Sequence, residues 1–179
     1  MTARPQLAAG RLDRALAGLQ AGTTGVLAML LWLGIWSAWQ REDFWASPNL
    51  LAGACYPSQA FHTGLAWSTA FGVALYILFY GGLGALFALA AARPMTRLRL
   101  ALLAMTLGLG WYWITYRWLW RAVLPLAAIL YGGRAAVVGH LIYGAMLGRF
   151  PRYLPGEPVP ETAPPAEQEA EVNSGAPAD

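Results

Sequence analysis

The stretch GLAWSTAFGVALYILFYGGLGALFALAAA, residues 64–92, contains no charged residue and is long enough to cross a bilayer as a single helix. A transmembrane helix needs about 20 consecutive, mainly apolar residues. Three other segments approach this length, around residues 23–39, around residues 98–120 and, with a weaker pattern, within residues 125–148. The sequence therefore predicts an all-α membrane protein with four transmembrane helices.

The composition supports a membrane protein and disfavours some functions. Charged residues make up 12% of the chain and hydrophobic residues 58%, with a mean hydropathy of +0.44. An ordinary soluble domain has about 25% charged residues. Between Asp43 and Glu157 the chain has no Asp or Glu at all. Because proton relays and cation-coupled carriers usually place a carboxylate in the membrane, the sequence disfavours both classes.

The basic residues predict the topology. All 12 are Arg, and in a membrane protein such an excess belongs at the bilayer edges rather than on a nucleic acid. One predicted side carries Arg4, Arg11, Arg14, Arg93, Arg97, Arg99, Arg149 and Arg152. The other side has at most Arg41, Arg117, Arg121 and Arg134, and all nine Trp residues map toward it. Both termini are therefore predicted to be cytoplasmic.

The chain divides into three parts by pattern. Residues 1–22 are expected to form an amphipathic cytoplasmic segment, because Leu12, Leu16 and Leu19 recur at helical spacing beside Arg residues. Residues 23–154 form the predicted transmembrane domain. Residues 155–179 are acidic and rich in Pro and Ala, a composition typical of a disordered tail.

Two local features shape the predicted helices. In the first outer loop, Ser47 followed by Pro48 offers an N-cap and a first helical residue, so a short helix over residues 48–55 is expected at the membrane interface. In the fourth span, Gly132 and Gly133 break the pattern, and Arg134 would cost about 2.5–3.5 kcal/mol near the bilayer centre. We therefore expect the fourth helix to start near Arg134 and to be short, ending near residue 149.

The fourth helix carries the most specific pattern of candidate site residues. A stripe of small residues recurs every four positions and is interrupted only by His140: Gly132, Ala136, Gly144 and Gly148. Such stripes let helices approach closely, so His140 is expected to face protein. Either it binds a ligand or shuttles protons, or it is a neutral buried histidine that is hydrogen-bonded, with Tyr76 or Tyr80 as possible partners. The second reading is favoured.

The two His residues and three of the Arg residues are candidates for other kinds of binding site. His62 and His140 are predicted to differ in depth by about 10 Å or more, so they cannot readily hold one haem, and we expect no cofactor and no metal. Arg117, Arg121 and Arg134 lie near the predicted outer face. They either bind an anionic ligand or lipid headgroup, or extend over the phosphates as ordinary interface residues. The ordinary role is favoured.

Two motifs resemble a known group of proteins. Residues 134–144, RAAVVGHLIYG, and residues 45–52, WASPNLLA, resemble segments of small uncharacterised bacterial membrane proteins with a Gly-His-Leu-x-Tyr-Gly fourth helix. The resemblance implies a four-helix, multi-pass protein of the bacterial inner membrane. It implies no activity.

Two functions are consistent with these observations. The favoured one is a non-catalytic membrane component with the lipid bilayer as its partner, possibly an accessory subunit of a larger protein assembly. The alternative is a binder or transporter of a small apolar or anionic molecule, with an outward-facing cavity of Trp, Tyr and Arg above His140. No catalytic nucleophile, base and acid constellation is visible, so an enzyme is not expected. A closed bundle would favour the first function, and a cavity reaching His140 would favour the second.

Overall fold

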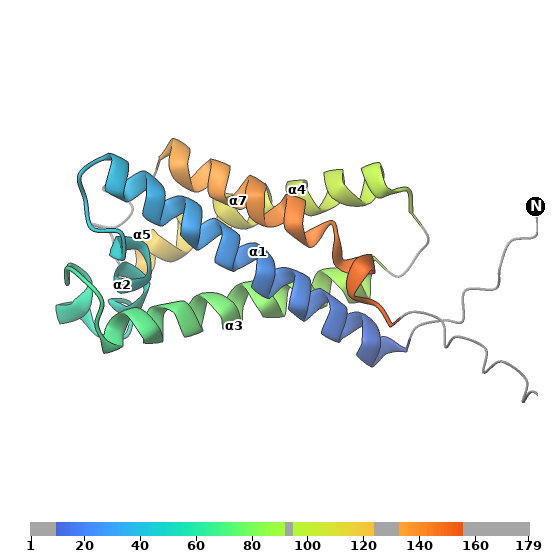
Figure 1. The fold of residues 1–179 in the computed structure, drawn as a ribbon, viewed down its shortest axis with the longest axis horizontal. Coiled ribbons are helices and arrows are strands. Elements are labelled where there is room, and N and C mark those ends of the chain that lie inside the picture. The colour runs from blue at the N-terminus through green and yellow to red at the C-terminus, as the bar shows by residue number, and fades with distance from the viewer. Residues whose placement is uncertain (1–9, 92–94, 124–132, 156–179) are drawn as a thin grey trace, which may run out of the picture. The chain divides into compact units, whose positions relative to one another are not determined.

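The computed structural model describes residues 10–91, 95–123 and 133–155. These residues fold into helices joined by turns and loops (Figure 1). The longer helices are α1 (Arg11–Trp39), α3 (Trp67–Ala90), α4 (Arg97–Ile114) and α7 (Arg134–Leu147). The shorter elements are α2 (Ala46–Ala52), the 3-10 helices η1 (Pro57–Gln59) and η3 (Phe150–Tyr153), the π-helix η2 (Thr115–Leu119), and α5 (Trp120–Val123). The predicted all-α class is confirmed for these residues. The predicted tail beyond residue 155, residues 1–9 and Gly132 lie outside them.

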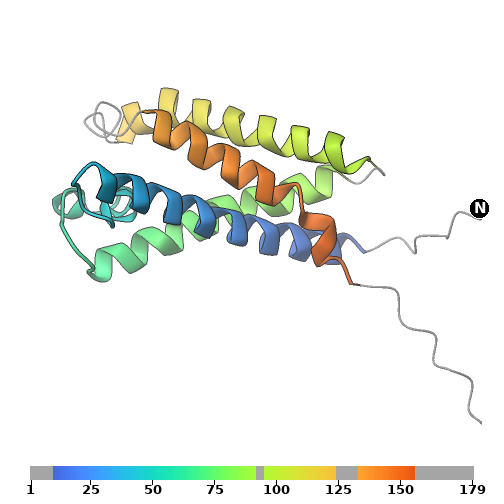
Figure 2. The same ribbon diagram turned by 45° about the horizontal axis from the view of Figure 1, so that its top comes forward.

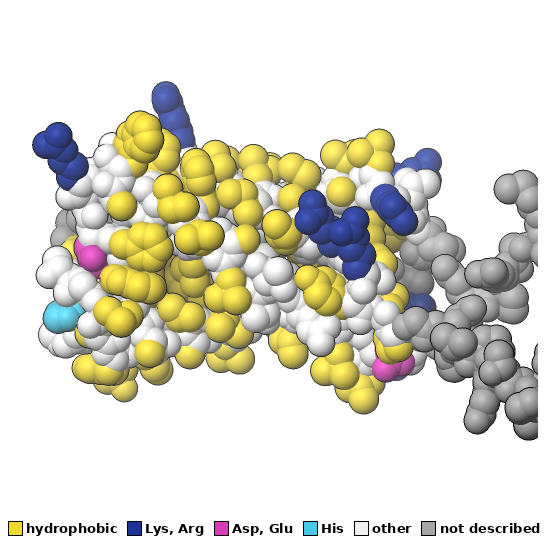
Figure 3. Space-filling model, in the orientation of Figure 1, with side chains coloured by type: hydrophobic (Ala, Val, Ile, Leu, Met, Phe, Trp, Pro, Cys, Tyr) yellow, Lys and Arg dark blue, Asp and Glu magenta, His cyan; other side chains and the backbone are white. Residues whose placement is uncertain are grey.

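Three helical segments are long and apolar enough to cross a membrane. They are α1, α3 and the continuous helical path Arg97–Val123 formed by α4, η2 and α5. α7 is apolar but shorter, with 14 residues, which corresponds to about 21 Å. Large apolar side chains on the outside of these helices are exposed, including Leu78, Leu86 and Leu102. Figure 3 shows hydrophobic side chains over the middle of one face and Arg side chains toward both of its ends, as expected for a membrane-embedded multi-pass protein.

The first helix differs from the sequence-based division at residue 22. α1 runs without interruption from Arg11, so the expected amphipathic segment and the first span are one helix. Ala17, Gly18 and Ala21 are buried in this part of α1, which packs on α3 and η3. The small residues therefore turn inward, and the exposed Leu12 lies on the opposite side. No helix boundary is therefore seen at residue 22, and the cytoplasmic position of the amphipathic segment stays a prediction.

The loop after α1 contains the expected short helix, with different ends. α2 starts at Ala46, and its N-cap residue is Trp45 rather than Ser47. Asn49 fixes the loop onto α3: its Nδ2 donates to the carbonyl oxygens of His62 (2.9 Å) and Gly64 (3.1 Å), and its Oδ1 accepts from the hydroxyl of Thr69 (2.6 Å). The position of α2 at a membrane interface stays a prediction.

The helices pack in a row in which α1 lies between α3 and α7, and α4 lies along α7 (Figures 1 and 2). Glycine sets the close approach in this row. A Cβ atom on Gly84 would lie 3.0 Å from the Cα of Gly22 and would contact the carbonyl oxygen of Gly18. A Cβ on Gly144 would lie 2.6 Å from the Cα of Met105. We call these two contacts, α1 with α3 and α7 with α4, the glycine-packed region.

Candidate functional site

His140 is buried in the bundle and bonded through both ring nitrogens. It is 6% exposed. Its Nδ1 lies 2.7 Å from the carbonyl oxygen of Ala136, and its Nε2 lies 2.7 Å from the hydroxyl of Tyr80. A carbonyl oxygen can only accept, so Nδ1 carries the proton, and in the neutral ring Nε2 accepts from Tyr80. The predicted burial of His140 and its predicted bond to a tyrosine are confirmed.

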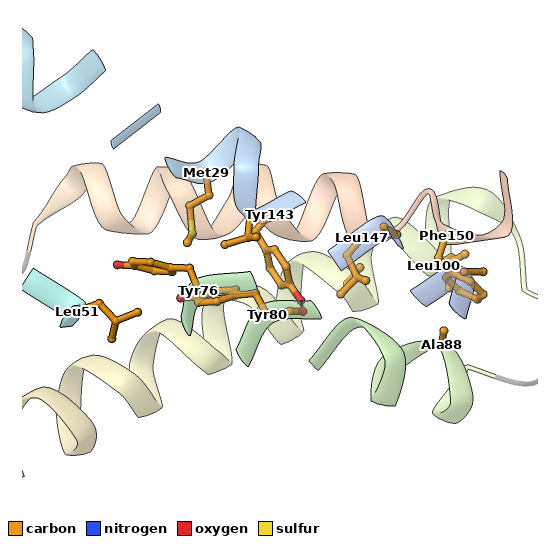
Figure 4. Packing of buried hydrophobic residues seen from close by; sticks show 13 residues of the cluster. Met29, Leu51, Tyr76, Tyr80, Ala88, Leu100, Tyr143, Leu147 and Phe150 are labelled. Carbon is orange, nitrogen blue, oxygen red and sulfur yellow. Dashed lines mark hydrogen bonds between the residues drawn. The ribbon is translucent and has the colours of Figure 1, made fainter. Parts of the chain in front are cut away.

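Tyr80 is the centre of an aromatic cluster that joins α3, α4 and α7. Its ring meets Tyr143 edge to face with centroids 4.9 Å apart and Trp111 edge to face at 6.4 Å. The hydroxyl of Tyr143 donates to the backbone carbonyl of Tyr80 at 2.8 Å. Figure 4 shows the rings of Tyr76 and Tyr80 side by side, with both hydroxyls pointing toward Leu51. This cluster forms the floor of a hollow region beside it.

That hollow region is a cavity of about 760 Å³ between α1, α2, α3, the α4–η2–α5 path and the start of α7. We call it the aromatic cavity. Of the residues that the structure describes, eight aromatic ones line it: Trp36, Tyr76, Phe79, Tyr80, Trp111, Tyr112, Tyr116 and Trp120. Its polar and charged lining side chains are Ser37, Gln40, Glu42, Ser47, Thr115, Arg134 and His140. The walls are therefore mainly apolar, with a few polar groups, as in small-molecule sites.

The structure brings together only some of the predicted site residues. His140, Tyr76, Tyr80 and Arg134 line the aromatic cavity. Arg117 and Arg121 are exposed and are not part of its lining. The two opposite charges of the lining, Arg134 and Glu42, are both on exposed residues. The three Arg residues therefore do not line this cavity together, and their favoured role as interface residues over the lipid phosphates stays a prediction.

A π-helical turn shapes one wall of the cavity. In η2 the backbone N–H of Trp120 donates to the carbonyl oxygen of Thr115, five residues earlier. Such turns inside α-helices are frequent at functional sites. The hydroxyl of Thr115 donates to the carbonyl oxygen of Trp111 at 2.9 Å. Thr115 and Tyr116 both line the cavity, so the wider turn aims consecutive side chains at the same space.

Sequence reasoning missed several lining residues. Ser37 from α1 and Ser47 and Leu50 from α2 belong to the walls, yet no local pattern assigns them to one site. The one available signal was Thr115 inside a predicted helix, because a mid-helix Thr often bonds back to a carbonyl and bends the helix. Among the described residues no three His, Cys, Asp or Glu side chains gather as a metal site would require. The cavity therefore offers binding surfaces and hydrogen bonds.

Comparisons with known proteins give no further guide to the site. No protein-family model matches the chain, and no curated protein or solved structure is significantly similar to it. The resemblance of its fourth helix to small bacterial membrane proteins stays a prediction.

Proposed function

We propose that the chain is a membrane protein that binds a small and mainly apolar molecule in the aromatic cavity. The observation that carries this proposal is the cavity itself. Its volume of about 760 Å³ lies within the usual range of small-molecule pockets, about 300–1,000 Å³. Rigid aromatic side chains supply large contact areas at a low cost in conformational entropy.

The position of the cavity supports a ligand that dissolves in the membrane. α3 packs on α1 and α2, whereas α4 packs on α7, and both α3 and α4 line the cavity. On α3, Phe79 lines the cavity and is 49% exposed, and on η2, Leu119 lines it and is 43% exposed. Residues that face the cavity are thus also open to the outside of the bundle, where lipid would lie.

The non-catalytic accessory subunit, which the sequence favours, is less well supported by this geometry. A component that acts only through packing needs no hollow region, and close packing is already provided by the glycine-packed region. The bilayer remains the expected partner in either case. We therefore propose the binding function over the accessory subunit. Protein partners in the membrane are compatible with it.

The proposal includes the predicted topology in a bacterial inner membrane. α7 is taken as a fourth, short span, both termini as cytoplasmic, and α2 as a helix at the outer interface. Cys55 is exposed, and Thr96 precedes α4 at the opposite end of the spans. In spheroplasts, an impermeant maleimide should label Cys55 in the natural chain. In a Cys55→Ser, Thr96→Cys variant it should give no labelling until the cells are broken, and the reverse pattern would overturn the topology.

A titration with pyrene tests the proposed binding. The protein is placed in phosphatidylcholine nanodiscs, and energy transfer from tryptophan to pyrene is measured against pyrene concentration. Trp36, Trp111 and Trp120 line the cavity, so a bound probe should accept their energy. Partition of pyrene into lipid gives an energy-transfer signal that rises linearly with pyrene concentration. We expect a saturable signal in addition to this linear one.

Two variants that fill the aromatic cavity, and one control variant on the outer surface, test where the probe binds. Ala136→Phe and Ser47→Phe each place a large side chain on a cavity wall and should weaken the saturable binding by at least about tenfold. Leu78→Phe enlarges a side chain on α3 that is 67% exposed. This variant should leave the saturable binding unchanged. A purely linear signal from the wild-type protein would contradict the proposal, as would equal binding by all three variants.

A further inference from the structure

We infer that the molecule bound in the aromatic cavity is uncharged, mainly flat and apolar, and carries a hydroxyl or carbonyl oxygen that hydrogen-bonds to Tyr76. This inference rests on the proposed function and adds the chemical class of the ligand. It depends on one group that the rest of the site leaves unused, the phenolic hydroxyl of Tyr76.

Tyr76 is a buried polar side chain without a partner. It is 9% exposed and lines the cavity. Its hydroxyl forms no hydrogen bond within residues 10–91, 95–123 and 133–155, and it is not among the polar atoms closed off from the cavity and solvent. The hydroxyl therefore faces space that another molecule can enter. A buried hydroxyl without a partner is unfavourable in apolar surroundings.

Four polar side chains near Tyr76 already donate their protons within the protein. Tyr80 donates to His140 at 2.7 Å, and His140 donates to the carbonyl oxygen of Ala136 at 2.7 Å. Tyr143 donates to the backbone of Tyr80 at 2.8 Å. The hydroxyl of Thr115 donates to the carbonyl of Trp111 at 2.9 Å. The Nε1 of Trp111 has no partner either, but it is closed off from the cavity, so on this wall the Tyr76 hydroxyl is the donor that a ligand can reach.

The orientation of Tyr76 fixes where the ligand oxygen lies. Figure 4 shows its hydroxyl pointing away from Tyr143 and toward Leu51, and Leu51 also lines the cavity. The ring of Tyr80 lies 5.7 Å from that of Tyr76 between centroids. A ligand oxygen at the Tyr76 hydroxyl therefore sits against apolar and aromatic walls.

These surroundings select the ligand by charge and shape. A charged group at the buried Tyr76 hydroxyl would lose much of its hydration among mainly apolar and aromatic lining side chains. A neutral hydroxyl or carbonyl accepts from Tyr76 at a much smaller desolvation cost. The flat rings of the walls favour a polycyclic or aromatic body by stacking and edge-to-face contact.

A pair of probes with the same shape tests the inference. 1-(Hydroxymethyl)pyrene and 1-ethylpyrene differ by one hydroxyl in place of one methyl group. Each is titrated in nanodiscs against the wild-type protein, Tyr76→Phe and the control Tyr56→Phe, whose residue is 45% exposed and outside the cavity. The comparison is made between proteins for one probe at a time, so partition into lipid cancels.

We expect Tyr76→Phe to weaken binding of 1-(hydroxymethyl)pyrene by about tenfold and to leave 1-ethylpyrene within about twofold. Tyr56→Phe should change neither probe. If Tyr76→Phe leaves both probes unchanged, the Tyr76 hydroxyl binds only water and the inference is wrong, although the proposed function stands. An equal loss of both probes would also overturn it. If neither probe gives saturable binding to the wild-type protein, the proposed function itself fails.

Discussion

The same helices pack in opposite ways in the glycine-packed region and around the aromatic cavity. In the first region Gly84 of α3 lies against Gly18 and Gly22 of α1, and the helices nearly touch through their backbones. In the second region the rings of Tyr80 and Trp111 meet between α3 and α4, and a cavity of about 760 Å³ lies beside them. The difference shows how side-chain size along one helix can close one part of a bundle and open another.

The largest effect is expected where the packing is closest. Gly84→Val would force methyl groups against the backbone of α1, so we expect a loss of about 3 kcal/mol of unfolding free energy. Gly82→Val is the matched control, because a Cβ on Gly82 has no atom within 4 Å. Reversible unfolding in mixed micelles measures both variants. Equal losses would show that valine in the helix, and not the contact with α1, causes the effect.

Asn49 holds in place the loop that forms one wall of the cavity. Asn49→Ala removes its hydrogen bonds to the carbonyls of His62 and Gly64 and to Thr69, so about 2–3 kcal/mol should be lost. Gln59→Ala, in the same loop, should change stability by less than about 0.5 kcal/mol. The same unfolding assay applies, and a stable Asn49→Ala variant would mean that the loop is held in place by apolar contacts alone.

A substitution at the floor of the cavity should lower stability more than a substitution on the surface. His140→Leu leaves the hydroxyl of Tyr80 and the carbonyl of Ala136 without their partners, which should cost about 2 kcal/mol. His62→Leu changes an exposed residue and should be tolerated. Thermal unfolding of the two purified variants compares them directly, and equal tolerance would refute the structural role of His140.

The smallest effect separates two buried tyrosines. Tyr143→Phe removes a hydroxyl that donates to the backbone of Tyr80 and should lower stability by about 1 kcal/mol. Tyr76→Phe removes a hydroxyl that forms no hydrogen bond with the part of the chain that the structure describes, so its stability should lie within about 0.5 kcal/mol of wild type. If Tyr76→Phe were the more damaging, its hydroxyl would have a structural partner.

The sequence predicted those features that depend on local pattern. The charge-free run of residues 64–92 identified α3, and the predicted helix start at Arg134 was found, in a helix of 14 residues. Because small residues recur every four positions around His140, its burial followed from spacing. The row of Tyr76 and Tyr80 on α3 then gave its partner, which the structure finds as Tyr80.

The cavity could not be read from such patterns. Its walls combine Ser37, Leu50 and Tyr116 from three elements far apart in sequence, and nothing in each local segment specifies that they meet. The π-helical turn after Ile114 changes the phase of the helix, and no residue pattern in the sequence predicted it. The continuity of α1 from Arg11 was not predicted either, because the exposed Leu12 and Leu16 suggested a separate surface helix.

Anomalous diffraction from crystals grown with 1-bromopyrene tests the central claim most directly, because bromine reports its position without an assumption about the site. We expect one strong bromine peak inside the aromatic cavity, within contact distance of Tyr76 and Trp111. In Ala136→Phe crystals that peak should be lost. Bromine found only on the lipid-facing surface, for example over Leu78 and Leu86, would contradict the binding function.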